Sequence, residues 1–377
     1  MSAQFSVLGQ PVKGEYRRRR WYNGRMPTLI LRQFVATLLF LHCAVLWNQV
    51  AQAEIVDDIY KAGLVVDGRD ARSLSAARRA GLVEVLVKAS GNPQAPESPQ
   101  VAAAIEDAQA YLLGYSYEED AQGVLLLRLD YDEQAVQQLL RESGLRLWTS
   151  NRPLVLTWLV VSDASGRRFA SVDAAPEADS VLRESFLRRG VPLQTPLYDL
   201  SDASAITPGE AWRQSSSALM AASSRYRGTE LLAGRVAQLS NGSWLGDWRY
   251  LDNGRWRSQS SSAKSLQAFT DAGAELVAAT LVEQYAVELS ADTDERYQLT
   301  LRGVRSFDDY VVLQQVLSSL EAVRNVVPHS LLGDQVSLRV EAETDLQQLA
   351  RIIELDPRFV PLPLESGQSG LSYEWIR

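Results

Sequence analysis

The sequence predicts a mixed α+β and α/β protein of several domains, in which two small α/β units of two or three layers precede a ferredoxin-like βαββαβ unit. Three observations support this fold class. Short apolar runs with strand character alternate with amphipathic stretches of helical spacing. Glycine and proline breaks separate these runs. The chain is also long enough for two or three domains of roughly 100–150 residues each.

We place the domain boundaries at these breaks. The expected parts are an N-terminal extension with a signal peptide at residues 1–53, a first α/β domain at 54–150, a second with a tryptophan-rich hairpin at 151–290, the ferredoxin-like domain at 295–362, and a C-terminal tail at 363–377.

The first domain combines helices with one hairpin. Gly91 ends the helix that precedes it, and Ser98 followed by Pro99 is a typical helix start. The expected elements are a strand at residues 55–66, helices at 72–90 and 99–112, strands at 111–118 and 124–130, and a helix at 132–144.

The second domain contains two apolar strands that read as buried on both faces. Asn253 and Gly254 separate two further strands, which is a strong signal for a two-residue hairpin turn. The expected elements are a strand at residues 154–161, helices at 176–189 and 215–228, strands at 230–239, 243–250 and 255–260, and a helix at 265–287.

The third domain has the order of a ferredoxin-like fold. Ser306 and Asp309 form a possible capping box, and Thr344 is expected to cap the second helix. The expected strands lie at residues 297–303, 323–327, 336–340 and 358–360. The apolar residues 371, 373 and 375 alternate as in a strand, so we expect the tail to pair with a sheet edge, preferably of its own chain.

Residues 34–47 form a mostly apolar run typical of a secretory signal peptide. Arg32 precedes this run, and the small residues Ala51 and Ala53 follow it as a cleavage site. The run is shorter than the roughly 20 apolar residues of a membrane span. We therefore expect cleavage after Ala53, a periplasmic location and no stable membrane anchor.

The residues before this run leave two interpretations open. The signal is complete when it starts at Met26, which favours a start codon there, whereas the four arginines at residues 17–20 allow a twin-arginine route. The only cysteine, Cys43, lies inside the apolar run. The exported chain would then contain no cysteine for a disulfide or a lipid anchor.

The net charge of the chain after residue 53 limits the kinds of molecule that it is expected to bind. Residues 54–377 contain 31 basic and 45 acidic residues, which gives a net charge near −14. Such a chain lacks the basic surface that nucleic acids and anionic membranes require, so basic or neutral partners fit better.

Two sequence stretches point to a family. Residues 85–92 read Val-Leu-Val-Lys-Ala-Ser-Gly-Asn after an alanine- and arginine-rich helix, and residues 147–154 read Leu-Trp-Thr-Ser-Asn-Arg-Pro-Leu and lead into Trp158, Leu159 and Val160. In these stretches the chain resembles the exported Gram-negative family catalogued as domain of unknown function 2066, over about residues 55–287. The resemblance implies export and architecture, and it implies no activity. The second domain is also similar in element order to envelope domains of curli-secretion and Tol-system proteins, which act through protein contacts.

Catalytic and metal motifs are scarce after residue 53. His329 is the one histidine there, and no Walker loop, Gly-x-Ser-x-Gly elbow or Gly-x-Gly-x-x-Gly fingerprint occurs. We therefore expect no catalytic residues, metal or cofactor. Clustered carboxylates could bind a cation or act as an acid–base pair, but helix capping explains them as well. They lie at residues 57–58, 118–120, 130 and 132, 292 and 294, and 308–309.

The tryptophan-rich hairpin is the first binding candidate. Trp244, Trp248 and Tyr250 share one face of a strand, and Arg257 joins them across the turn, as Arg255 does. Such a face could stack sugars or peptides, and the alternative is that its rings form core beneath a helix.

A second candidate lies where the first two domains meet. Trp148, Asn151 and Arg152 form it, with interdomain packing as the alternative.

Three functional hypotheses follow. The leading one is a non-catalytic periplasmic protein that binds an envelope protein, with no nucleic acid among its partners. The alternative is a glycan- or peptide-binding module that uses the aromatic hairpin. A carboxylate-dependent hydrolase is the third.

Overall fold

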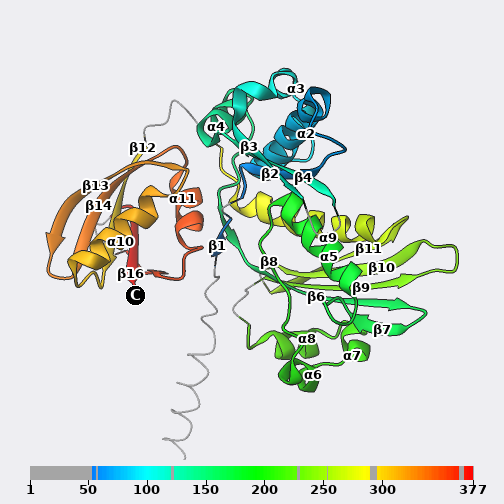
Figure 1. Ribbon diagram of the computed structural model, residues 1–377. Coiled ribbons are helices and arrows are strands. Elements are labelled where there is room, and N and C mark those ends of the chain that lie inside the picture. The colour runs from blue at the N-terminus through cyan, green and yellow to red at the C-terminus, as the bar shows by residue number, and fades with distance from the viewer. Residues whose placement is uncertain are drawn as a thin grey trace, which may run out of the picture. The chain divides into compact units, whose positions relative to one another are not determined.

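A computed structural model describes residues 53–56, 58–119, 123–226, 230–252, 254–288, 295–364 and 369–376. The expected signal run, both possible starts and Cys43 lie outside these residues. The described part of the chain is mixed α and β, as predicted (Figure 1). None of its helices is long and apolar enough to cross a membrane.

The first sheet is antiparallel, and helices cover one of its faces (Figure 1). Its strands are β2 (Lys61–Val65), β4 (Leu125–Tyr131) and β3 (Leu112–Glu119), and its helices are α2 (Ala71–Ser90), α3 (Pro99–Glu106) and α4 (Glu133–Glu142). Leu82 and Leu86 of α2 belong to the same buried core as Leu127 and Leu129 of β4. Gly91 ends α2 with φ of 67°, as predicted.

Two expectations for this region were wrong. The expected strand at residues 55–66 is interrupted by a turn, in which Lys61 N–H donates to the Asp58 carbonyl. The piece before the turn, β1 (Ala53–Ile55), pairs instead with β5 (Asn151–Pro153). The expected helix at residues 99–112 ends at Glu106. A short 3-10 helix at residues 108–111 follows it and leads directly into β3, which begins at Leu112.

The second sheet is covered by helices on both faces (Figure 1). Its strands run in the order β11 (Arg255–Ala263), β10 (Trp244–Asp252), β9 (Glu230–Gln238), β6 (Val155–Asp163) and β7 (Gly166–Phe169), and β8 (Leu193–Gln194) also pairs with β6. On one face lie α5 (Pro176–Arg189) and α9 (Leu266–Tyr285), and on the other α6 (Leu200–Ala205), α7 (Pro208–Trp212) and α8 (Ser216–Ser223).

Alternation along β6 explains these layers. Leu159 belongs to the core under α5 and α9, whereas Trp158 belongs to the core under α6, α7 and α8. The strand is therefore buried on both faces, as its continuous apolar sequence predicts. The expected helix at residues 215–228 is wrong in length, because α8 ends at Ser223. The short helices α6 and α7 were not predicted.

The third sheet has the predicted ferredoxin-like element order and one additional strand. Its elements are β12 (Glu295–Arg302), α10 (Phe307–Ser318), β13 (Val323–Leu332), β14 (Gln335–Ala342), α11 (Leu346–Ile353), β15 (Phe359–Pro361) and β16 (Leu371–Trp375). The strand order is β13-β14-β12-β16-β15. The C-terminal strand β16 thus pairs within its own chain, parallel to β12 and antiparallel to β15.

Helix capping in this sheet domain was predicted in part. The Ser306 and Asp309 capping box at the start of α10 is confirmed. Thr344 is not the cap of α11, because the Asp345 carboxylate takes that place and accepts from Gln348 N–H at 2.9 Å.

Candidate functional site

The tryptophan-rich face predicted as a binding platform is part of the core. Trp248 is fully buried, its indole Nε1 donates to the Phe269 carbonyl at 2.9 Å, and the two rings stack with centroids 4.8 Å apart. A Cβ atom on Gly234 of β9 or on Gly273 of α9 would lie within 2.4 Å of the indole. These two glycines leave the space that the ring fills, so the face is closed by the protein itself.

The remaining residues of that face are also committed to internal contacts. Tyr250 is fully buried and its hydroxyl donates to Glu230 Oε2 at 2.5 Å, while Trp244 is half-buried against the same core. Arg257 lies opposite Tyr250 as predicted, and it pairs with Asp252 at 2.8 Å. The expected stacking platform is therefore not formed, because α9 covers the rings.

Glu230 is the most perturbed carboxyl of this region. Burial raises its pKa to about 7, against the lowering effect of the Tyr250 hydroxyl, and the Asp252 charge raises it further. Among the described residues no Lys or Arg forms an ion pair with Glu230.

Arg152 is a structural residue. Its guanidinium is fully buried, lies 3.7 Å from the centre of the Trp148 ring, and donates only to backbone carbonyls. The acceptors are the carbonyls of Thr149, Gly190, Lys88 and Trp148, at 2.6 to 2.9 Å. Burial lowers the pKa of Arg152 to about 9.

This arrangement assigns the second predicted site to packing. Lys88 lies in the last turn of α2 and Gly190 directly follows α5, so the positive charge meets the negative ends of two helix dipoles. Asn151 Nδ2 donates to the Ile352 carbonyl at 3.3 Å. Trp148 and Arg152 are fully buried, and no surface of either side chain faces solvent.

Several of the clustered carboxylates in the described residues serve as caps or form ion pairs. Asp132 caps α4 and Asp309 belongs to the capping box of α10. Asp58 pairs with Lys61, and Glu118 with Arg128. No group of three or more His, Cys, Asp or Glu side chains in the described residues could hold a metal ion. The carboxylates at residues 57, 120, 292 and 294 lie outside them.

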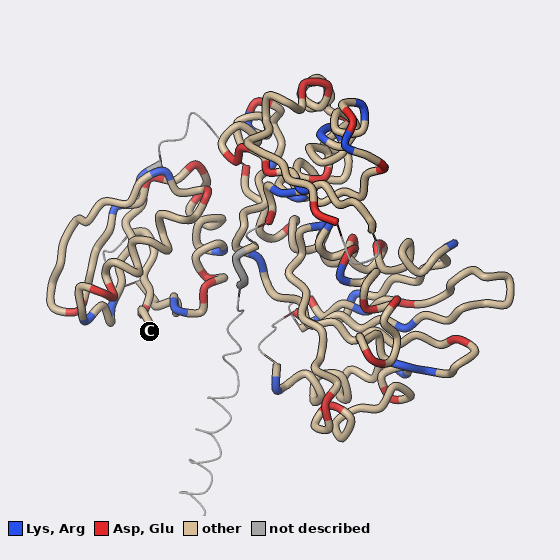
Figure 2. Tube along the Cα trace, in the orientation of Figure 1, with Lys and Arg blue, Asp and Glu red and all other residues tan. Residues whose placement is uncertain are grey.

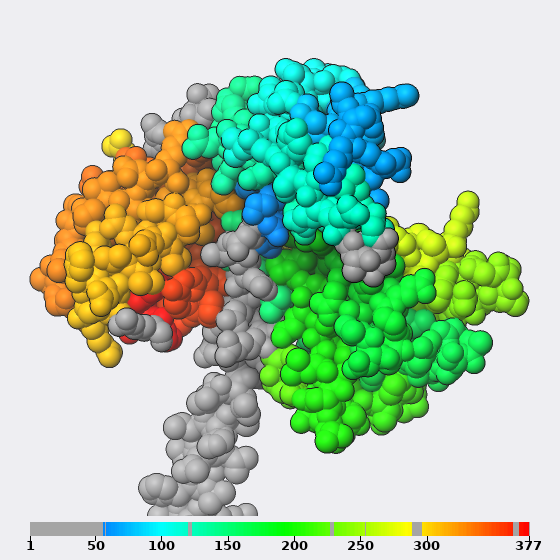
Figure 3. Space-filling view, in the orientation of Figure 1, coloured from blue at the N-terminus to red at the C-terminus, as the bar shows by residue number. Residues whose placement is uncertain are grey.

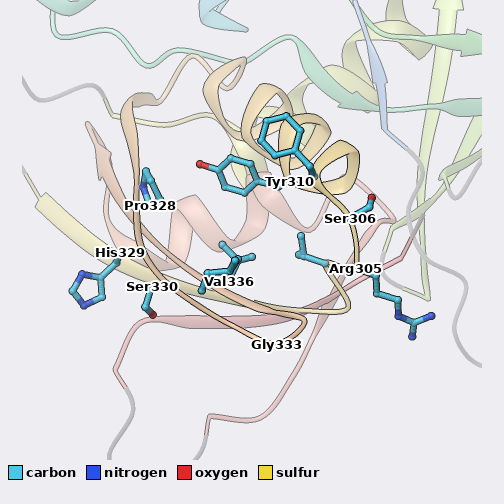
Figure 4. Close-up of a pocket in the computed structure, with 11 residues that line it drawn as sticks. Arg305, Ser306, Tyr310, Pro328, His329, Ser330, Gly333 and Val336 are labelled. Carbon is cyan, nitrogen blue, oxygen red and sulfur yellow. The ribbon is translucent and has the colours of Figure 1, made fainter.

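An open groove lies instead at the end of the third sheet, between the start of α10 and the β13–β14 hairpin (Figure 4). We call it the C-terminal groove. Its volume is about 520 Å³, and it is lined by Val304, Arg305, Ser306, Phe307, Tyr310, Pro328, His329, Ser330, Leu331, Gly333 and Val336. Gly333 forms the hairpin turn with φ of 65°, and the capping box fixes the entry of the chain into α10.

The surroundings of the groove are apolar. Phe307 is 76% exposed, and Leu331 and Leu332 are 69% and 78% exposed. No Lys, Arg, Asp or Glu occurs between Arg324 and Asp334, and Figure 2 shows this stretch of the hairpin without charge. Figure 3 shows α10 and the hairpin on the surface of the molecule.

The polar side chains at the groove do not converge. Figure 4 shows the His329 imidazole and the Arg305 guanidinium directed away from Tyr310 and Val336, which face the space. The groove therefore offers apolar contact and strand backbone. Sequence reasoning missed it, although two leucines directly before a Gly-Asp turn are an unusual place for exposed apolar side chains.

Comparison with known proteins gives a family for one region only. A family described as "Domain of unknown function (DUF8605)" matches residues 53–149. This region contains the first sheet and is less than half of the chain, so it assigns no family to the whole protein. No curated protein matches the chain.

The match corrects the resemblance to domain of unknown function 2066, because the matching family is a different one. The stretches that carried the resemblance, residues 85–92 and 147–154, form a glycine-capped helix end and a short turn into a strand. Such local patterns recur in many folds and do not distinguish families.

One solved structure, named "Crystal structure of uncharacterized protein", is similar over 35% of this chain and 90% of its own, with 8% sequence identity and a TM-score of 0.17. A TM-score this low shows neither a shared fold nor a shared function.

Proposed function

We propose that the protein is a non-catalytic component of the cell envelope that binds another protein, and that it holds an extended apolar segment of that partner in the C-terminal groove. The observation that carries the proposal is the groove itself, whose apolar walls include the exposed side chains of Phe307 and Leu331. Contiguous exposed apolar surface of this kind marks protein interaction sites.

The free edge of the sheet beside the groove favours a partner segment in an extended conformation. β13 is the outermost strand, is ten residues long and has one free edge. The opposite edge strand, β15, has only three residues, which limits pairing at that edge. Strand addition at a free edge, with alternate side chains entering adjacent pockets, is a common mode of peptide recognition.

Location and charge support an envelope partner. Residues 34–47 have the pattern of a secretory signal peptide, and the acidic balance of the following residues favours a basic or neutral partner. The alternative of a glycan- or peptide-binding aromatic hairpin is less favoured, because Trp248 and Tyr250 are fully buried.

Site-specific photo-crosslinking in cells tests the proposal. A photoreactive amino acid replaces Leu331 in one variant and Val172 in the control, since Val172 is exposed to a similar extent, 71%, on a loop away from the groove. We expect a discrete crosslinked partner for the Leu331 position only. Equal labelling of many proteins from both positions, or none from Leu331, would contradict the proposal.

A further inference from the structure

A half-buried carboxyl, that of Glu230, lies where three elements of the second sheet domain end. Glu230 opens β9, and the register of Leu231 with Leu251 places Asp252, the last residue of β10, opposite it. Gln284, in the last turn of α9, donates to Asp252 Oδ1 at 2.7 Å. Two carboxyls on neighbouring strands thus share one small region beneath the end of a helix.

Tyr250 and Asp252 of β10 act directly on the pKa of Glu230. The other titratable and charged groups of this region in the described residues are Arg257 on β11, Tyr285 at the end of α9, and Arg351 and Glu354, which act on Tyr285 from α11 and the residue after it. Arg257 is bound to Asp252, and Arg351 donates to the Gln284 carbonyl at 3.4 Å. Neither cation forms an ion pair with Glu230, whose carboxylate accepts a hydrogen bond from the Tyr250 hydroxyl.

We propose that the protonation of Glu230 controls local packing in the second sheet domain. Its neutral form keeps the ends of β9 and β10 packed against the last turn of α9, and its ionisation loosens that packing. The ionised carboxylate would lie half-buried, opposite the Asp252 carboxylate, and like charges directly across a strand pair destabilise the pair. This inference is independent of the C-terminal groove.

The sign of the pH dependence follows from linkage. Glu230 has a pKa of about 7 in the folded chain, above the ordinary value of 4.5, so the folded state holds the proton more tightly. Its contribution to stability is fully present below about pH 4.5 and is lost as the pH rises through 7. The folding equilibrium constant should fall by up to about 70-fold between pH 5 and pH 8 because of this group alone.

The test compares urea unfolding midpoints across pH 5 to 8 for the wild-type chain and the Glu230→Gln variant, which mimics the neutral form. We expect a falling midpoint in the wild type and a much flatter profile in Glu230→Gln. Glu283→Gln, an exposed position on α9, serves as the matched control and should keep the wild-type slope. A flat wild-type profile, or an equal slope in Glu230→Gln, would overturn the proposal.

A second pair of variants keeps the proposal testable if Glu230→Gln does not fold. The Tyr250 hydroxyl favours the ionised form, so Tyr250→Phe should move the midpoint of the transition to higher pH. Asp252 disfavours the ionised form, so Asp252→Asn should move it to lower pH. Hydrogen exchange in the last turn of α9 should follow the same order, and shifts in the same direction for both variants would also overturn the proposal.

Discussion

The hairpin under α9 and the hairpin beside α10 both carry bulky apolar side chains, aromatic in the first and mainly Val and Leu in the second, but only the first is covered. Strands of nine residues span about 30 Å, and so does the 20-residue helix α9 that lies over β10. The ten-residue strand β13 spans about 33 Å, whereas the 12-residue helix α10 spans only about 18 Å. The uncovered part of the second hairpin is the C-terminal groove.

The difference shows that exposure of apolar side chains depends on the covering element. Trp248 and Tyr250 have the residue types of a binding platform, yet α9 turns them into core. Leu331 and Leu332 have the residue types of a core, yet no helix reaches them. Aromatic content alone therefore selected the wrong hairpin as a binding surface.

The largest expected effect tests the covered hairpin. Trp248→Ala should lower the free energy of unfolding by about 3–5 kcal/mol, because it removes a fully buried ring and leaves a cavity between Gly234 and Gly273. Urea denaturation measures this loss. Trp256→Ala is the control, since Trp256 is half-buried and should cost less. A stable Trp248→Ala protein would show that the ring is not part of the core.

A similar or somewhat smaller loss in the free energy of unfolding is expected at Arg152, which belongs to the second predicted site and is also buried. Arg152→Met should cost about 3 kcal/mol or more, because four carbonyl groups lose their donor inside the protein. Arg152→Lys should not restore stability, since an ammonium group cannot reproduce the planar set of donors. Thermal unfolding of the two variants decides this, and full rescue by lysine would mean that the charge alone matters.

A medium effect is expected where α9 meets the indole. Gly273→Ala places a methyl group 2.4 Å from the Trp248 ring and should cost about 1–3 kcal/mol by overpacking. Gly114→Ala is a suitable control, because its added Cβ meets nothing within 4 Å. If the two variants unfold at the same urea concentration, α9 does not press on the ring as described.

The smallest effect on stability is expected at the open hairpin. Leu331→Ala should change the free energy of unfolding by less than about 0.5 kcal/mol, since the side chain is 69% exposed. The same variant should weaken recovery of the crosslinked partner when the photoreactive amino acid is placed at Phe307, which also lines the groove. A large loss of stability in a chemical denaturation series would show that the hairpin is supported by unrecognised packing.

Much of the fold could be predicted because its signals are local. Gly91, Gly190 and Gly254 all adopt positive φ where the sequence places a helix end or a hairpin turn. The capping box of α10 needs only two residues three positions apart. The short helices α6 and α7 were not predicted, because segments of five or six residues carry too little periodicity to be recognised.

The candidate site could not be predicted by the same means. The C-terminal groove depends on how far α10 extends over β13, the strand that follows it in the chain. The position of Glu230 likewise depends on the register that sets it opposite Asp252. Neither relation leaves a periodic pattern in the sequence.

The sequence by itself determined the elements that local chemistry specifies: helix ends, hairpin turns, doubly buried strands and the βαββαβ order of the last domain. Tertiary structure alone decided which of two apolar hairpins is covered, that Arg152 binds carbonyls rather than a ligand, and that β16 inserts between β12 and β15. The physical reason is that backbone conformation responds to neighbouring residues, whereas burial and the perturbed acidity of Glu230 arise from contacts between distant segments.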